Sequence, residues 1–183
     1  MCFRKRVWYT FRYRSAARLR EKQRRFKNEK ESSVFVPGRA AEPSDDLSGA
    51  VVILHTNDVH GAIDGYAKAA ALKKTYEDMG AYVLLMDAGD FSQGDPTVSA
   101  SQGATAVELM NLAGYDLAAP GNHEFDYGYQ NLSTLASEAE FPIVAANVLY
   151  NGKTAFEDNV TFTAPDGTKI GVFGLDTPET ATK

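Results

Sequence analysis

Residues 51–61, with the sequence VVILHTNDVHG, constrain the fold more than any other segment of the chain. The segment begins with four apolar residues, valine and isoleucine among them, which predicts a strand covered on both faces. Asp58 and His60 follow this strand and lie two residues apart, so that in extended backbone their side chains project to the same side. Gly61 comes directly afterwards and allows the backbone to turn sharply. A carboxylate and an imidazole directed toward one point at the carboxyl end of a strand predict a transition-metal site.

After this segment, apolar strands alternate with amphipathic helices. The alternation predicts the α/β fold class, with a mainly parallel sheet whose crossover connections are right-handed. In the first helix, Ala67, Ala70, Ala71, Tyr76 and Met79 are expected to lie near one face. The predicted strands are residues 51–54, 81–86, 115–119 and 141–148, the predicted helices are residues 66–79, 103–112 and 129–139, and a hairpin is expected at residues 160–163 and 169–175.

The charged residues divide the chain into two parts of opposite sign. Residues 1–50 hold 13 Lys and Arg and 6 Asp and Glu, a net charge of +7, whereas residues 51–183 hold 6 and 18, a net charge of −12. An acidic body binds nucleic acid poorly, because the phosphates repel it. The basic residues 1–48 are expected to form a disordered head and linker, and the folded domain is expected to begin near Gly49.

Two functions of this basic head stay open on the sequence. Its arginines alternate with Phe, Trp and Tyr, a pattern that suits either stacking on a nucleic acid or binding to an anionic membrane surface. Arg12, Arg14 and Arg18 interrupt the apolar residues, so that no signal peptide is recognisable. No run approaches the roughly 18 apolar residues of a transmembrane segment. The single cysteine, Cys2, excludes an internal disulfide.

Two later strands are also predicted to end in polar residues that suit metal chemistry. The second strand leads to Asp90, and the third leads to Asn122 and His123. Because the carboxyl ends of parallel strands share one edge of a sheet, these side chains are expected to meet the ligand pair of the first strand. Two divalent ions roughly 3.5–4 Å apart would clamp a phosphate there, with Asp90 as the bridging carboxylate and Asn122 as a neutral ligand. His123 would face the substrate, and Asp126 would orient its ring.

Four motifs resemble those of a known family. Asp-x-His, then Gly-Asp, then Gly-Asn-His-Glu is similar to the signature of the calcineurin-like metallophosphatases. The longer matches resemble the 5′-nucleotidase family, which includes UDP-sugar hydrolases and 2′,3′-cyclic-nucleotide phosphodiesterases. The resemblance covers residues 51–183 and none of residues 1–48. The motifs are HTNDVHG at 55–61, DAGD at 87–90, GNHEFD at 121–126 and GLDTPE at 174–179.

The resemblance implies a four-layer αββα sandwich and a metal-dependent phosphoester hydrolase that acts on nucleotides. The cofactors would be two divalent ions such as zinc or manganese, with metal-bound hydroxide as the nucleophile. The partner would be a nucleotide or another small phosphoester, and the location would be extracytoplasmic: periplasmic, secreted or at the cell surface. The residues carried over are Asp58 and His60 for the first metal, Asp90 as the bridge, Asn122 for the second metal, and His123 with Asp126 as the catalytic dyad.

The sequence also departs from the family's pattern. Family members supply further metal ligands from later segments and hold the nucleotide base with a separate C-terminal domain, neither of which residues 49–183 contain. These residues are therefore expected to be the N-terminal part of a metallophosphatase domain, carrying half of its site. Two alternatives stay open: a truncated, catalytically incompetent metal-binding fragment, and a hydrolase of sugar nucleotides or cyclic nucleotides.

Several polar residues near the motifs are expected to support the site without joining the chemistry. His55 lies within the first strand, so a structural role is expected. Asp87 is expected to hold the loop that carries Asp90, and Glu124 is expected to hold its own loop by hydrogen bonds. Ser92 lies in no nucleophile-elbow motif, so a covalent serine mechanism is not expected.

Overall fold

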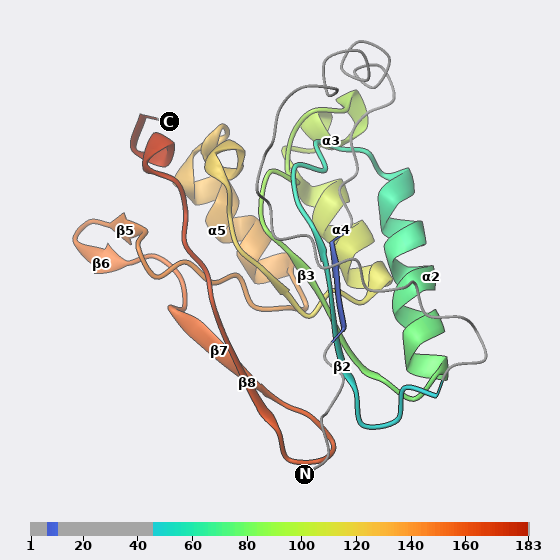
Figure 1. The fold of residues 1–183 in the computed structure, drawn as a ribbon. Coiled ribbons are helices and arrows are strands. Elements are labelled where there is room, and N and C mark those ends of the chain that lie inside the picture. The colour runs from blue at the N-terminus through green and yellow to red at the C-terminus, as the bar shows by residue number, and fades with distance from the viewer. Residues whose placement is uncertain (1–6, 11–45, 183) are drawn as a thin grey trace, which may run out of the picture.

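Parallel strands form the central sheet of the computed structural model, which describes residues 7–10 and 46–182 (Figure 1). The strand order is β1-β2-β3-β4, and every pairing is parallel, which confirms the predicted sheet. Pairing is longest between β2 and β3, from Val51 opposite Tyr82 to Thr56 opposite Asp87. The strands are β1 Val7–Thr10, β2 Val51–Thr56, β3 Tyr82–Asp87 and β4 Leu117–Ala118.

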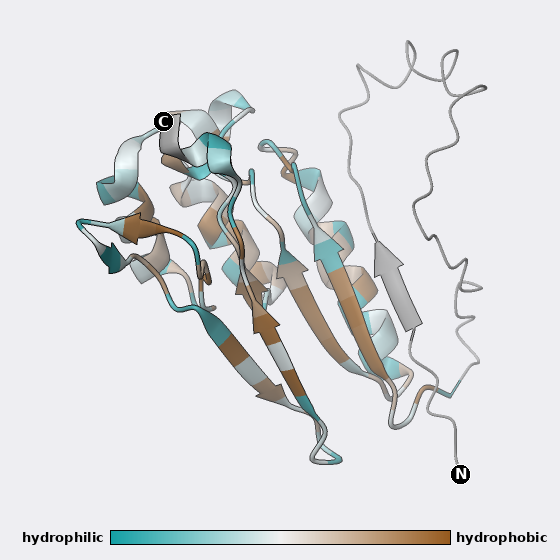
Figure 2. Ribbon diagram, turned by 60° about the vertical axis from the view of Figure 1, so that its left-hand side comes forward, coloured by the Kyte–Doolittle hydropathy of each residue, from teal (hydrophilic) through white to brown (hydrophobic). Residues whose placement is uncertain are grey.

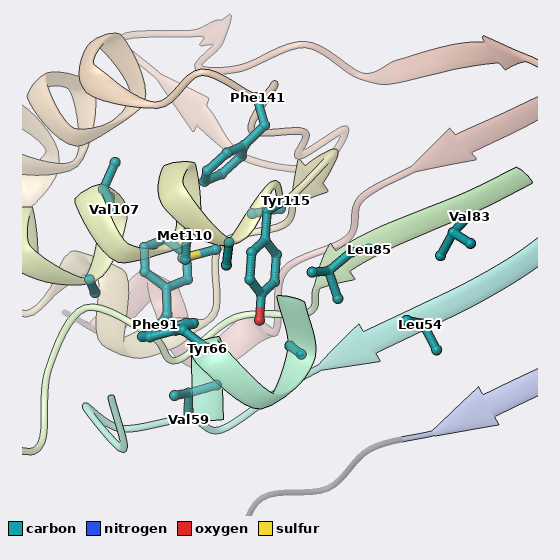
Figure 3. Close-up of a cluster of buried hydrophobic side chains, with 14 of the residues drawn as sticks. Leu54, Val59, Tyr66, Val83, Leu85, Phe91, Val107, Met110, Tyr115 and Phe141 are labelled. Atoms are coloured by element: carbon teal, nitrogen blue, oxygen red, sulfur yellow. The ribbon is translucent and has the colours of Figure 1, made fainter. Parts of the chain in front are cut away.

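Helices cover one face of this sheet and enclose the larger core cluster. Figure 3 shows Leu85 of β3 beside the ring of Tyr115, with Leu54 and Val83 farther along their strands. No helix in the described part of the chain is both long and apolar enough to cross a membrane. The helices are α2 Asp64–Asp78, α3 Pro96–Ala100, α4 Ala104–Ala113 and α5 Gly128–Glu138, with the 3-10 helices η1 Asn122–Phe125 and η2 Pro178–Thr182.

An antiparallel hairpin, β7 Asn159–Thr163 with β8 Lys169–Phe173, packs against the other face of the sheet. Its inward residues form a second apolar cluster with Leu84 and Met86 of β3, and the apolar residues along both strands are visible in Figure 2. The predicted hairpin is therefore confirmed. Helices, parallel sheet and hairpin give α, β and β layers in that order. A short ladder of β5 Leu149–Tyr150 and β6 Lys153–Thr154 precedes the hairpin.

The strand expected at residues 141–148 is wrong. Only isolated bridges form there, at Ile143 and Val144, because Pro142 lacks an N–H group and the later N–H groups bond to separate segments. The N–H of Ala145 donates to the Glu157 carbonyl, and the next N–H donates to Gly174. The segment thus adds a single parallel bridge beside Ala118 of β4 and then ties the hairpin to the sheet.

The basic head lies almost wholly outside the described residues. Residues 1–6 and 11–45 are not described, so the expectations of disorder and of nucleic-acid or membrane binding fall outside the structure. The exception is β1, Val7–Thr10, which pairs in parallel with β2.

Candidate metal centre

The loops that follow β2 and β3 are joined by backbone hydrogen bonds. The N–H of Asp58 donates to the Gly89 carbonyl at 2.9 Å, and the N–H of His60 donates to the Asp90 carbonyl at 2.9 Å. Asp58 and His60 both adopt left-handed backbone, with φ of 51° and 47°, so the extended backbone expected from the sequence is wrong. Such backbone is uncommon outside glycine and marks constrained sites. The two loops therefore form one rigid unit at the carboxyl edge of the sheet.

Asp58, His60 and Asp90 converge on one point of this unit. One possible ligand atom from each of these residues lies within 4.8 Å of the others. The Nε2 atom of His60 lies 3.9 Å from the nearest Asp58 oxygen and 4.0 Å from the nearest Asp90 oxygen. Two carboxylates and an imidazole at this spacing are a donor set that zinc and manganese accept. The structure thus brings together the three residues predicted for the first metal.

Asp90 occupies the deepest position of the three. Its side chain is 15% exposed, whereas that of Asp58 is 61% exposed. Asp90 also has left-handed backbone, with φ of 62°. Its Oδ1 atom accepts the backbone N–H of His123 at 3.1 Å. Asp90 therefore lies between the Asp58–His60 pair and η1, where a bridging ligand would have to be.

The Nδ1 atom of His60 lies 2.9 Å from the side-chain amide of Gln93. When Nε2 of a histidine binds a metal, Nδ1 carries the proton and needs an acceptor, which the Gln93 carbonyl oxygen supplies in one of the two amide orientations. Gln93 was not singled out by the sequence, because a lone glutamine in a glycine-punctuated loop carries no local signal.

His123 and Asp126 form a pair beside the metal group. Nδ1 of His123 lies 2.6 Å from Oδ2 of Asp126, and the His123 ring meets the His60 ring edge to face at 5.4 Å between centroids. This hydrogen bond orients the imidazole and leaves Nε2 as the atom available to a substrate. Asn122 is the first residue of η1, directly before His123. Its role as a metal ligand stays a prediction.

Glu124 is fully buried, and its carboxylate fixes the backbone of the loop after β3 and of its own loop. Its two carboxylate oxygens accept four backbone N–H groups, from Asp90 at 2.7 Å, Phe91 at 2.8 Å, Ser92 at 2.9 Å and Gly121 at 2.6 Å. Burial raises the pKa of Glu124, and the N–H donors act in the opposite direction. The structural role expected for Glu124 is confirmed.

Asp87 supports the same loop from the end of β3. Its carboxylate accepts the N–H of Gly89 at 2.8 Å and the hydroxyl of Thr56, which is itself 2.8 Å from the Tyr115 hydroxyl. Burial raises the pKa of Asp87 well above its usual range, despite the hydrogen bond from Thr56. The expected supporting role of Asp87 is thus confirmed.

Fold and site together have the features of an α/β phosphoesterase: a group of candidate metal ligands and a histidine–aspartate pair at the carboxyl edge of a parallel sheet. The chain belongs to the calcineurin-like phosphoesterase family, whose profile matches residues 51–181.

The most similar relatives include Protein 5NUC of Lutzomyia longipalpis and Protein UshA of Yersinia enterocolitica. The first is 32% identical over 77% of this chain and 29% of its own length, and the second is 34% identical over 82% of this chain and 30% of its own. Among solved structures, a 5′-nucleotidase precursor from Thermus thermophilus superposes with a TM-score of 0.63 and 29% identity. The alignment covers 70% of this chain and 29% of that one. The chain therefore spans less than a third of the length of these relatives.

Proposed function

We propose that the chain acts as a metal-dependent phosphoester hydrolase on nucleotides. The observation that carries this proposal is the convergence of Asp58, His60 and Asp90 on one point, with His123 at their side. The relatives support the substrate class, since they include a protein named a trifunctional nucleotide phosphoesterase in Bacillus subtilis and a snake venom 5′-nucleotidase in Gloydius brevicauda.

Two divalent ions such as zinc or manganese are proposed. Asp58, His60 and Asp90 fit the first ion, whereas Asp90 and Asn122 alone are too few ligands to bind the second tightly. Asp58 and His60 would hold the first ion, Asp90 would bridge, and Asn122 would give a neutral oxygen to the second. When bound, the ions would polarise the phosphoryl oxygens and activate the attacking water. The bridging position suits Asp90 because its carboxylate is the deepest in the group and lies next to η1.

His123 would stabilise the phosphoryl group during transfer. Asp126 accepts a hydrogen bond from Nδ1 of His123 and so orients the ring, which leaves Nε2 to face a phosphoryl oxygen. Fixed donors directed at the charge that develops in the transition state lower the barrier without reorganisation. His123 and Asp126 are thus proposed as the catalytic dyad.

An extracytoplasmic location is also proposed. The relative named snake venom 5′-nucleotidase supports this location.

The experiment combines a Mn²⁺ titration by calorimetry with an assay of phosphate release from a nucleoside monophosphate. Wild type should bind the ion and release phosphate only when the ion is present. The double variant Asp58→Ala with His60→Ala should lose both properties, whereas Asp158→Ala, which changes an exposed carboxylate far along the chain, should keep both. Unchanged Mn²⁺ binding in the double variant would refute the metal assignment.

A further inference from the structure

Each of the three candidate ligands of the first metal directs one atom toward the other two. Nε2 of His60 lies 3.9 Å from Oδ1 of Asp58 and 4.0 Å from Oδ2 of Asp90. In two of these residues the second donor atom is already held by the protein. Nδ1 of His60 lies 2.9 Å from the side-chain amide of Gln93, and Oδ1 of Asp90 accepts the N–H of His123 at 3.1 Å. His60 and Asp90 can therefore each offer one atom to an ion without losing a hydrogen bond.

Asn57 holds the second oxygen of Asp58 in the same way. Asn57 directly follows β2, and its side-chain NH₂ group donates to Oδ2 of Asp58. The NH₂ group faces this carboxylate because an ionised carboxylate only accepts hydrogen bonds, so the carbonyl oxygen of the amide would be repelled. Among the residues that the structure describes, this is the one hydrogen bond that the Asp58 carboxylate accepts. Oδ1 of Asp58 is thus left to bind an ion.

Asp58 needs such support more than the other two ligands do. Its side chain is 61% exposed, whereas those of His60 and Asp90 are 39% and 15% exposed. The N–H of Asp58 donates to the Gly89 carbonyl, which fixes the backbone, but burial does not confine the carboxylate. An exposed side chain that binds an ion gives up rotamer freedom, and this loss weakens binding. The hydrogen bond from Asn57 removes part of that freedom before the ion binds.

We propose that Asn57 is a positioning residue of the candidate metal centre. Its amide holds Oδ2 of Asp58 away from the ion and so presents Oδ1 to it. The first ion would then receive three protein atoms, one each from Asp58, His60 and Asp90, and would keep coordination positions open to a substrate. Three protein ligands with an open position are usual for catalytic zinc sites, whereas structural sites are closed by a fourth ligand. This inference rests on the proposed function and adds to it a residue outside the ligand set.

The test measures the Mn²⁺ affinity of the full chain by calorimetry and the melting temperature of the metal-free chain. Asn57→Leu keeps the approximate size of the side chain but removes the donor. It should bind Mn²⁺ about tenfold more weakly, the lower end of the usual effect of removing a partner of a metal ligand. Asn57→Gln keeps an amide donor and should bind Mn²⁺ more tightly than Asn57→Leu does. Both variants should melt within a few degrees of wild type, because the hydrogen bond lies at the exposed side of the site.

Asn159→Leu is the matched control, because it changes an exposed asparagine at the start of β7, and it should bind Mn²⁺ like wild type. Equal Mn²⁺ binding by wild type and Asn57→Leu would refute the role of Asn57 and leave the proposed function intact. Weaker binding by Asn57→Gln than by Asn57→Leu would also refute it, since the size of the side chain and not its donor would then decide the affinity. A melting temperature of metal-free Asn57→Leu far below that of wild type would show that Asn57 supports the fold and not the ligand. A wild type that binds no Mn²⁺ would refute the proposed function, and this inference with it.

Discussion

The carboxylate of Glu124 accepts the backbone N–H of Asp90 at 2.7 Å, which joins two residues 34 positions apart in the chain. Three further N–H groups donate to the same buried carboxylate, so that the loop carrying Asp90 is shaped by a residue of η1. Asp90 keeps left-handed backbone within this arrangement. The geometry of the candidate metal centre therefore depends on a side chain that is not one of its candidate ligands.

The first prediction concerns Glu124→Gln. A glutamine has one oxygen in place of two, and its NH₂ group would face backbone N–H donors, so at least one buried N–H would lose its partner. Mn²⁺ affinity should fall by about 10–100-fold, the usual effect of removing an outer support of a metal ligand. Calorimetry measures the affinity, and Glu140→Gln, an exposed control, should leave it unchanged. Full Mn²⁺ affinity in Glu124→Gln would contradict this supporting role.

The second prediction uses the glycine that touches Asp90. A Cβ atom on Gly121 would overlap the Asp90 carboxylate, and the φ of −101° at this position suits any residue, so Gly121→Ala acts through contact alone. The Gly121→Ala variant should bind Mn²⁺ more weakly than wild type. This loss of affinity should be larger than the fall in the melting temperature of the variant accounts for. Gly171→Ala is the matched control, because a Cβ atom there would meet nothing within 4 Å. If both variants bind Mn²⁺ like wild type, the Asp90 side chain is not confined as described.

The third prediction is a dependence of stability on pH that originates at Asp87. Its pKa is raised in the folded state, so between the ordinary value of 3.8 and the raised value the folded chain binds more protons than the unfolded chain. The free energy of unfolding of the metal-free chain should therefore fall as pH rises through this window. Asp87→Asn should flatten the slope, as measured by urea unfolding from pH 4 to pH 8. If Asp87→Asn has the same slope as wild type and as the exposed control Asp158→Asn, then the pH dependence does not originate at Asp87.

The sequence alone was sufficient to predict that Asp58, His60 and Asp90 come together, because parallel strands present their carboxyl ends at one edge. It was not sufficient to predict how they meet. The extended backbone expected at Asp58 and His60 is replaced by left-handed backbone, since their N–H groups bond to carbonyls of the loop after β3. Those partners lie about thirty residues away, and no local pattern reveals them.

The buried face of the first helix was also predicted only in part from the sequence. Ala67 and Ala71 were expected on the same face of the helix as the others, yet both are exposed, whereas Met79 is buried and Ala70 packs against the core as expected. Alanine is small and only weakly hydrophobic, so its spacing indicates a helix better than it indicates the buried face. The aromatic Tyr76 was assigned correctly, because a large ring determines the packing of its helix.

The fourth prediction concerns the boundary of the folded domain, which is proposed near Gly49. Leu47 packs against the core, and its N–H donates to the Met79 carbonyl at 2.8 Å. A chain that begins at residue 46 should melt within a few degrees of the full chain, because the core clusters of the described side chains begin at residue 47 and β1 is only a four-residue edge strand. A chain that begins at Gly49 should melt lower than one that begins at residue 46. If the chain that begins at residue 46 melts far below the full chain, then residues 1–45 contribute to the fold.

The fifth prediction separates His123 from the metal ligands. His123→Asn should lower kcat for a nucleoside monophosphate by about 10²–10³-fold, the usual effect of losing one donor to the transition state, while Mn²⁺ stoichiometry stays the same. Asp126→Asn should give a smaller loss, because Asp126 acts through the hydrogen bond that orients the His123 ring. Asp90→Asn should remove metal and activity together, since the bridge would serve both ions. If His123→Asn loses Mn²⁺ as completely as Asp90→Asn does, then His123 is a metal ligand and the dyad assignment is wrong.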